Sequence, residues 1–152
     1  MRYYEDLTVG ETASYGHYPI TRDEVIEFAS RYDPQDFHLD DKAAEAGFFG
    51  RLTGSGWMTC AVTMRMIADR FKDSQLQVCG GSGAEELAWK IPVNPGDTLT
   101  VRETLLGKRR SKSRPELGLR RTRFETLNQD GDVVLHMIVS DMVRTRDPDG
   151  TD

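Results

Sequence analysis

The residues best suited to acid–base chemistry lie in one short stretch, YDPQDFHLD, at residues 32–40. Asp33 and His38 are five positions apart around a turn, so their side chains could converge on one water molecule. Pro34 is disfavoured inside a helix and restricts the residue before it, which places Asp33 at a helix exit. Loops held by rigid elements often carry catalytic side chains. The stretch therefore suggests a carboxylate–imidazole pair that moves protons.

Two other interpretations fit the same residue types. Acids and a histidine in a loop are usually solvated turn or cap residues, and a His/Asp pair alone is a weak signal of catalysis. Asp40 would serve as the N-cap of a short helix over residues 41–46. His38 and Asp40 also offer ligand atoms to a metal, but no second histidine or cysteine lies at ligand spacing. The residue types leave catalysis and a plain loop open, and we expect no metal.

A second candidate site is the segment Gly54-Ser55-Gly56, which opens an apolar helix predicted over residues 56–71. The first N–H groups of a helix lack partners and carry the positive end of its dipole. Glycine lets a ligand approach them closely. The functional interpretation is an oxyanion hole with the Gly56 N–H as donor. The structural alternative is a tight helix entry.

Regular elements must position both segments. A strand over 13–20 leads to a helix that Thr21 caps, with Glu24 completing a capping box, and that ends near Arg31. The helix predicted over 56–71 is apolar on most sides, which is typical of a helix buried in a core. It is too short and too charged to span a membrane.

The second half of the chain has the pattern of strands. Residues 73–83 are predicted to be a glycine-rich turn, followed by strands over 86–91, 99–105, 117–127 and 133–143. Strands joined by short turns favour an antiparallel sheet. Such a sheet around one long central helix is an α+β hot-dog fold. We expect one domain over 1–146 and a polar C-terminal tail over 147–152, with fraying after residue 143.

Composition narrows the class of protein further. The 152 residues carry a formal net charge of −5, which does not suggest a protein that binds nucleic acid or a membrane. Residues 108–123, named here the basic stripe, hold eight Lys and Arg against the single acid Glu116, a net charge of +7. The stripe indicates either an anionic ligand or a solvated sheet face. Two cysteines, no apolar signal core and no spanning run predict a soluble, cytoplasmic protein.

The stretch at 32–40 resembles the Asp-x-Asn-Pro-x-His-x-Asp signature of the MaoC-like dehydratases, also called R-specific enoyl-CoA hydratases. Asp33 and His38 fall on the catalytic aspartate and histidine of that family, and Asp40 on its trailing acid. Gln35 and Asp36 depart from its asparagine and proline. The resemblance runs from about residue 4 to 144. Further stretches that carry it are residues 54–57 (GSGW), 92–97 (PVNPGD), 111–115 (SKSRP) and 127–131 (LNQDG).

The resemblance implies the hot-dog fold, a homodimer, and reversible addition of water to a 2-enoyl-CoA thioester to give an (R)-3-hydroxyacyl-CoA. It implies Asp33, His38 and Gly56 as the catalytic groups and no cofactor beyond the coenzyme A of the substrate. We expect five residues to bind that substrate: Ser55, Trp57, Arg110, Lys112 and Arg114. The alternatives are a hot-dog acyl-CoA thioesterase and a non-catalytic subunit that binds acyl thioesters.

Overall fold

The structure is a computed structural model that describes residues 1–151. It begins with a short 3-10 helix, η1 (Tyr4–Asp6), and strand β1 (Thr12–Pro19). The helices are α1 (Arg22–Tyr32), α2 (Asp36–Leu39), α3 (Asp41–Glu45) and α4 (Gly56–Ser74). The remaining strands are β2 (Val78–Trp89), β3 (Thr98–Arg110), β4 (Leu117–Leu127) and β5 (Val133–Arg144).

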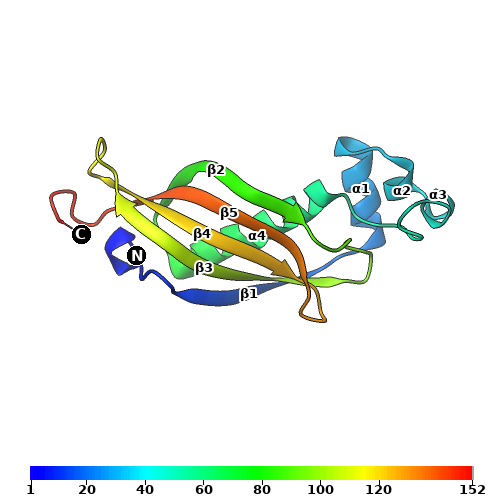
Figure 1. Ribbon diagram of the computed structural model, residues 1–152, viewed down its shortest axis with the longest axis horizontal. Helices are drawn as coiled ribbons and strands as arrows, with labels where there is room; N and C mark the ends of the chain where they lie inside the picture. Colours follow the sequence, from blue (N-terminus) through cyan, green and yellow to red (C-terminus); the bar gives the residue numbers. More distant parts are fainter. Residues whose placement is uncertain (152) are drawn as a thin grey trace.

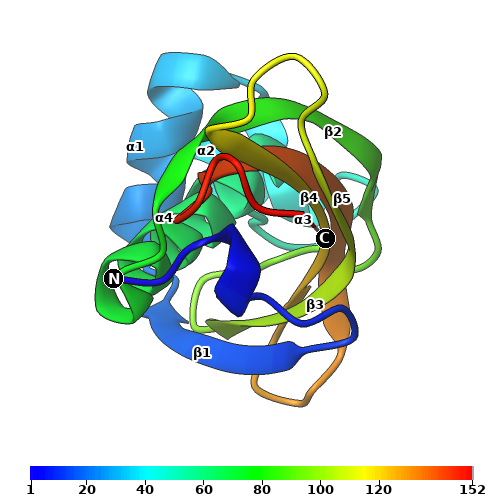
Figure 2. The same cartoon turned by 90° about the vertical axis from the view of Figure 1, so that its left-hand side faces the viewer.

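The strands form one five-stranded sheet in the order β1-β3-β4-β5-β2, and every neighbouring pair is antiparallel. Helix α4 lies along one face of this sheet (Figure 1), and the end-on view shows the strands curving around it (Figure 2). Helices α1, α2 and α3 gather beyond one end of the sheet (Figure 1). This arrangement confirms the hot-dog fold that the sequence predicted.

The core lies between α4 and the sheet. The buried face of the helix contributes Met58, Val62, Met66 and Ile67 to one cluster. The sheet side of that cluster consists of Leu99, Val101, Phe124, Val134, Leu135 and Met137. Full burial of one such side chain contributes about 1.5–3 kcal/mol, so this contact fixes the position of α4 and of the residues at its N-terminus.

Strand β2 differs from its prediction. The glycine-rich segment expected to be a turn belongs to the strand, which begins at Val78 and pairs with β5 through Gly80, Gly81 and Gly83. The pairing register shifts three times along β2, and Glu86 has a positive φ of 52°. Glycine lacks the side chain that sequence patterns rely on, and edge strands tolerate such irregularities. Pairing with β5 therefore decided the structure of this segment.

The C-terminal tail is also more ordered than its polar composition suggested. The Glu5 carboxylate accepts hydrogen bonds from the backbone N–H groups of Arg146 and Asp147. The Arg110 guanidinium donates to the same carboxylate at 3.0 Å. The expected fraying from Arg144 onward is therefore wrong up to Asp147, because η1 supplies a carboxylate partner.

No helix within residues 1–151 is long and apolar enough to cross a membrane.

Candidate active site

Helices α1 and α2 and the N-terminus of α4 meet beyond one end of the sheet (Figure 1). Helix α1 begins at its cap Thr21, whose side chain accepts a hydrogen bond from the Glu24 N–H, as the sequence predicted. It ends at Asp33, where φ of −151° and ψ of 66° leave the helical region just before Pro34. This exit turns the Asp33 carboxylate toward α2 and the N-terminus of α4.

His38 lies in the single turn of α2 and is buried. Its Nδ1 is 2.6 Å from the carbonyl oxygen of Thr53. A carbonyl can only accept, so Nδ1 carries the proton, and in the neutral ring Nε2 keeps its lone pair. That Nε2 is 3.4 Å from Asp33 Oδ2. The sequence prediction that these two side chains converge is therefore confirmed by the geometry.

Separate donors bind the two oxygens of the Asp33 carboxylate. Ser55 Oγ donates to Oδ2 at 2.7 Å, and Gln35 Nε2 donates to Oδ1 at 2.7 Å. The Ser55 bond is the main reason that the pKa of Asp33 lies below its usual 3.8; burial opposes it, while Gln35 and His38 add to the lowering. Hydrogen bonds to the charged form favour ionisation. The carboxylate is therefore negatively charged near neutral pH.

Ser55 has a role that the sequence did not predict. Its hydroxyl caps α4 by accepting from the Trp57 N–H at 3.2 Å while it donates to Asp33. The residue is fully buried and does not line the pocket described below. The expectation that Ser55 contacts substrate is therefore corrected: its hydroxyl is used to orient Asp33 and to begin the helix.

Gly56 combines an N–H that no helical carbonyl accepts with close packing against Trp89. As the first residue of α4 its N–H has no acceptor within the helix, and the Ser55 hydroxyl takes the N–H of Trp57 instead. A Cβ on Gly56 would lie 2.6 Å from the Trp89 ring, whose Nε1 donates to the Gly56 carbonyl at 2.8 Å. A side chain at position 56 would therefore collide with the Trp89 ring, and glycine allows the ring to pack directly on the backbone.

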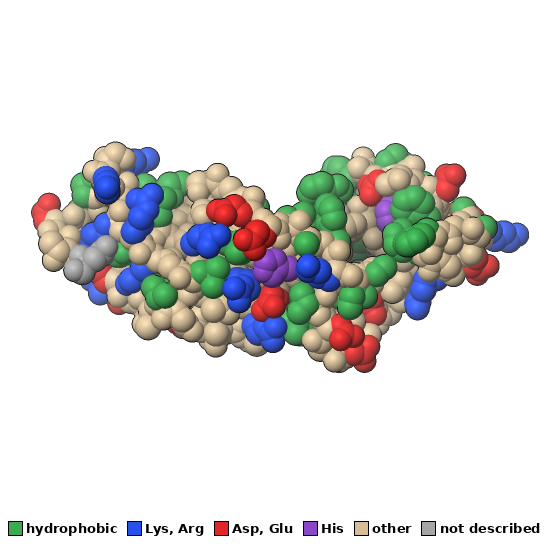
Figure 3. Space-filling view, in the orientation of Figure 1, with side chains coloured by type: hydrophobic (Ala, Val, Ile, Leu, Met, Phe, Trp, Pro, Cys, Tyr) green, Lys and Arg blue, Asp and Glu red, His purple; other side chains and the backbone are tan. Residues whose placement is uncertain are grey.

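These residues line a pocket of ≈ 490 Å³. Most of its wall is aromatic or aliphatic: Phe37, Phe48, Phe49, Trp57, Trp89, Ile91, Pro92 and Val93. Figure 3 shows the hollow between the helical end and the rest of the molecule, with hydrophobic side chains on both sides. Lys90 is the one cationic side chain among the described lining residues. The pocket combines apolar walls with a few convergent polar groups, as small-molecule sites do.

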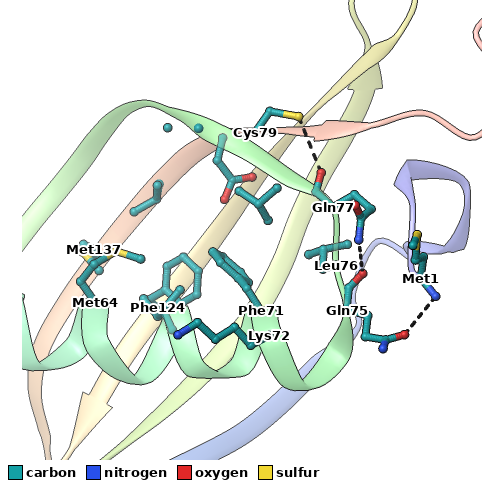
Figure 4. A pocket seen from close by; sticks show the side chains of 16 residues that line it. Met1, Met64, Phe71, Lys72, Gln75, Leu76, Gln77, Cys79, Phe124 and Met137 are labelled. Atoms are coloured by element: carbon teal, nitrogen blue, oxygen red, sulfur yellow. Dashed lines mark hydrogen bonds between the residues drawn. The ribbon is translucent and has the colours of Figure 1, made fainter.

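A larger cavity of ≈ 760 Å³ lies farther along α4, between that helix and strands β2 and β5. In Figure 4 the side chains of Met64, Phe71, Phe124 and Met137 gather at this cavity. Gln75 and Gln77 lie at the end of the cavity near the N-terminus (Figure 4). The second cavity is therefore mainly apolar and adjoins the same helix as the first.

The structure does not bring the basic residues Arg110, Lys112 and Arg114 to the pocket that Asp33 and His38 line. They lie at the β3–β4 turn, at the opposite end of the protomer from α1 to α3 (Figure 1). Arg110 forms an ion pair with Glu5 at 3.0 Å, and Arg114 forms one with Glu116 at 2.8 Å. The expected phosphate contact is therefore not formed with the pocket of the same protomer.

The remaining predicted residues have different roles in the structure. Trp57 lines the pocket as expected, whereas Asp40 caps α3 by accepting from the Ala43 N–H, which is the plain structural interpretation of that residue. Sequence reasoning missed Gln35, Lys90 and Trp89 as parts of the site. Only Gln35 had a signal, since it departs from the family motif. Within residues 1–151, no cluster of His, Cys, Asp and Glu is arranged to hold a metal ion.

The chain is similar to several known proteins. A family profile described as MaoC like domain matches residues 7–125. The crystal structure of a MaoC-like dehydratase from Rhodospirillum rubrum is 36% identical, with a TM-score of 0.85 over 97% of this chain and 99% of that chain. The unliganded R-hydratase PhaJ1 from Pseudomonas aeruginosa is 21% identical, with a TM-score of 0.69 over 95% of this chain and 86% of that one. The second likeness shows the fold alone.

Among curated proteins, the uncharacterized protein YdeM of Bacillus subtilis is 27% identical over 126 residues. That match covers 82% of this chain and 86% of YdeM. A Mycobacterium tuberculosis protein with a double hotdog fold matches 99% of this chain and 46% of its own length, with a TM-score of 0.76 and 21% identity. The fold is therefore common to the three solved structures.

Proposed function

The chain belongs to the MaoC-like dehydratase family, and from this we propose that it is a hydratase that adds water reversibly to the double bond of a 2-enoyl-CoA thioester. One observation carries the proposal. His38 presents an unprotonated Nε2 beside the ionised Asp33, in a pocket that Gly56 also lines. A base, a charge partner and an oxyanion donor are the groups that this addition needs.

The reaction can be followed atom by atom. A water bound between Asp33 and His38 gives one proton to Nε2 and its hydroxyl to the β-carbon of the substrate. The electron pair of the double bond moves to the thioester oxygen, where the Gly56 N–H stabilises the resulting enolate. The imidazolium then returns its proton to the α-carbon on the same face. Dehydration is the same sequence reversed.

His38 carries the proton in this proposal and Asp33 does not. Two donors and a lowered pKa make the Asp33 carboxylate the poorer base of the pair. An ionised carboxylate has about four lone-pair sites, so it can still accept from the water after binding Ser55 and Gln35. Its negative charge also stabilises the imidazolium that forms 3.4 Å away.

The two cavities suggest how the rest of the substrate is held. From Gly56 to Met64 the helix rises roughly 12 Å, so an acyl group of medium length at Gly56 would reach the larger cavity. Lys90, at the rim of the site pocket, is the nearest candidate for the phosphates of coenzyme A. This proposal moves the phosphate contact from the basic stripe to a residue beside the chemistry.

We further propose a homodimer. Trp57 and Met64 on α4 are 58% and 47% exposed, so one sheet leaves part of this apolar helix uncovered. Strand β2 lies at the sheet edge next to it, with an unpaired outer side. Exposed apolar patches and free edges favour pairing with another chain. A second copy joined at β2 would cover both features at once.

The experiment is incubation of the protein with crotonyl-CoA, hexenoyl-CoA and decenoyl-CoA, with product stereochemistry resolved by chiral chromatography. The proposal expects the (R)-3-hydroxyacyl-CoA. Release of free coenzyme A, detected with a thiol reagent, would instead identify a thioesterase. Stabilisation by acyl-CoA without turnover of any ester would identify a non-catalytic binding subunit.

A further inference from the structure

We infer that Gln35 is a positioning residue, which holds the Asp33 carboxylate in the orientation that leaves His38 free to accept a proton. This inference rests on the proposed hydratase function. Gln35 stands where the family motif has asparagine, so the motif alone marks it as a departure. The structure shows instead that its side chain contacts the catalytic carboxylate directly.

Gln35 is bonded to both members of the catalytic pair. Its backbone N–H donates to the Asp33 carbonyl at 2.8 Å, and its own carbonyl accepts from the His38 N–H at 2.8 Å. These backbone hydrogen bonds shape the turn between Asp33 and His38, and a side-chain substitution at position 35 would leave them in place. The side chain adds one further bond, from Nε2 to Asp33 Oδ1 at 2.7 Å.

That side-chain bond restrains a torsion that is otherwise soft. The torsion that rotates an aspartate carboxylate has broad minima, so the single hydrogen bond from Ser55 to Oδ2 would let the carboxylate rotate and Oδ1 change position. With Gln35 on Oδ1, both oxygens are fixed. The remaining lone pairs are then available for water and, once His38 has accepted a proton, for the imidazolium, whose Nε2 is 3.4 Å from Oδ2.

The length of the side chain matters in this geometry. An asparagine at position 35 is one methylene shorter, so we expect its amide to fall short of Oδ1, which the Gln35 amide reaches at 2.7 Å. We expect Gln35→Asn to behave like Gln35→Leu, which has no donor at all.

The same contact helps to keep Asp33 charged. Hydrogen bonds to a carboxylate lower its pKa, and the Gln35 bond is one of the causes of the lowering here, after that of Ser55. Removing the donor raises the pKa of Asp33 toward its usual value. Because the proposed chemistry uses the ionised carboxylate, this bond favours the form of Asp33 that the reaction needs.

The test compares Gln35→Leu and Gln35→Asn with Gln129→Leu as the matched control. Gln129 is another exposed glutamine whose amide donates to a carboxylate, Asp97 Oδ1 at 3.1 Å, and it lies between β4 and β5, outside the lining of both cavities. We expect kcat to fall roughly tenfold in both Gln35 variants, since a hydrogen bond to a charged group is lost, with KM nearly unchanged. Gln35 is exposed, so solvent replaces much of the lost bond and the melting temperature should fall only slightly. The control variant should have the kcat and KM of the wild type.

A second readout does not depend on turnover. The Asp33 carboxyl is titrated by ¹³C NMR in the free protein, and its pKa should rise in both Gln35 variants and stay fixed in the control. An unchanged pKa with unchanged kcat overturns the inference, as does an effect on KM alone, which would make Gln35 a substrate contact. If the wild type turns over no enoyl thioester, the proposed function fails. The NMR result then still decides whether Gln35 positions the carboxylate.

Discussion

Substitution of Ser55 by alanine removes one hydroxyl that serves two structural purposes. The hydroxyl caps α4 through the Trp57 N–H and donates to the Asp33 carboxylate, in a position that water does not reach. Loss of an N-cap costs about 0.5–2 kcal/mol. Loss of a hydrogen bond to a charged group costs about 1.5–3 kcal/mol. The Asp33 side chain is only 18% exposed, so solvent replaces little of this bond.

The expected loss in free energy of unfolding is therefore about 3 kcal/mol at pH 7. For a chain of this length that corresponds to a fall in melting temperature of roughly 6–12 °C. The matched control is Thr21→Ala, because Thr21 caps α1 through the Glu24 N–H and makes no bond to Asp33. The control should lose only the cap, about 1 kcal/mol.

The two variants should also differ in pH dependence. Asp33 has a folded pKa below its usual 3.8, so its contribution to stability is present above that pH and is lost as the pH falls through the folded pKa. Because Ser55 is the main cause of the lowering, the extra destabilisation of Ser55→Ala over Thr21→Ala should shrink below about pH 4. Urea unfolding followed by circular dichroism at several pH values measures both differences. Equal destabilisation of the two variants at pH 7 would refute the assigned role of Ser55.

Two further predictions concern the substrate and the assembly. Lys90→Ala should raise KM for an enoyl-CoA severalfold and weaken the dependence of KM on salt. KM for the matching pantetheine ester, which has no phosphates, should stay unchanged. An equal rise in KM for both esters would show that Lys90 does not contact the phosphates. Arg114→Ala, at the far end of the protomer, is the control that should change neither. Light scattering should give the mass of a dimer, and the mass of one chain at working concentration would exclude the proposed β2 contact.

Local rules predicted the parts of the site that depend on neighbouring residues. The cap at Thr21 and the restriction imposed by Pro34 placed Asp33 at a helix exit, where the structure has it. The second half of the predicted capping box is not formed, because the Glu24 carboxylate accepts from the Tyr18 hydroxyl instead. The apolar pattern from Gly56 onward identified the central helix and hence the free N–H groups at its start. Each of these follows from backbone chemistry within one turn of the residue concerned.

Contacts between distant segments were not accessible in this way. The sequence offered no means to see that Ser55 faces Asp33 instead of the ligand, or that Trp89 covers Gly56, because both contacts depend on how α4 packs. The basic stripe was recognised by charge alone. Its distance from the site follows from the length of β3 and β4, which carry their shared turn to the opposite end of the sheet (Figure 1).

The most direct measurement is hydration of a 2-enoyl-CoA by the wild type, by Asp33→Asn, by His38→Gln and by the double variant. Both substitutions keep the side-chain volume close, so circular dichroism should show an intact fold. The account predicts an (R)-3-hydroxyacyl product from the wild type and a loss in kcat on the order of 10²–10⁴ in each single variant. The double variant should lose little more than the worse single one, because the two residues act on one water. Full hydratase activity in a folded Asp33→Asn protein would contradict the account.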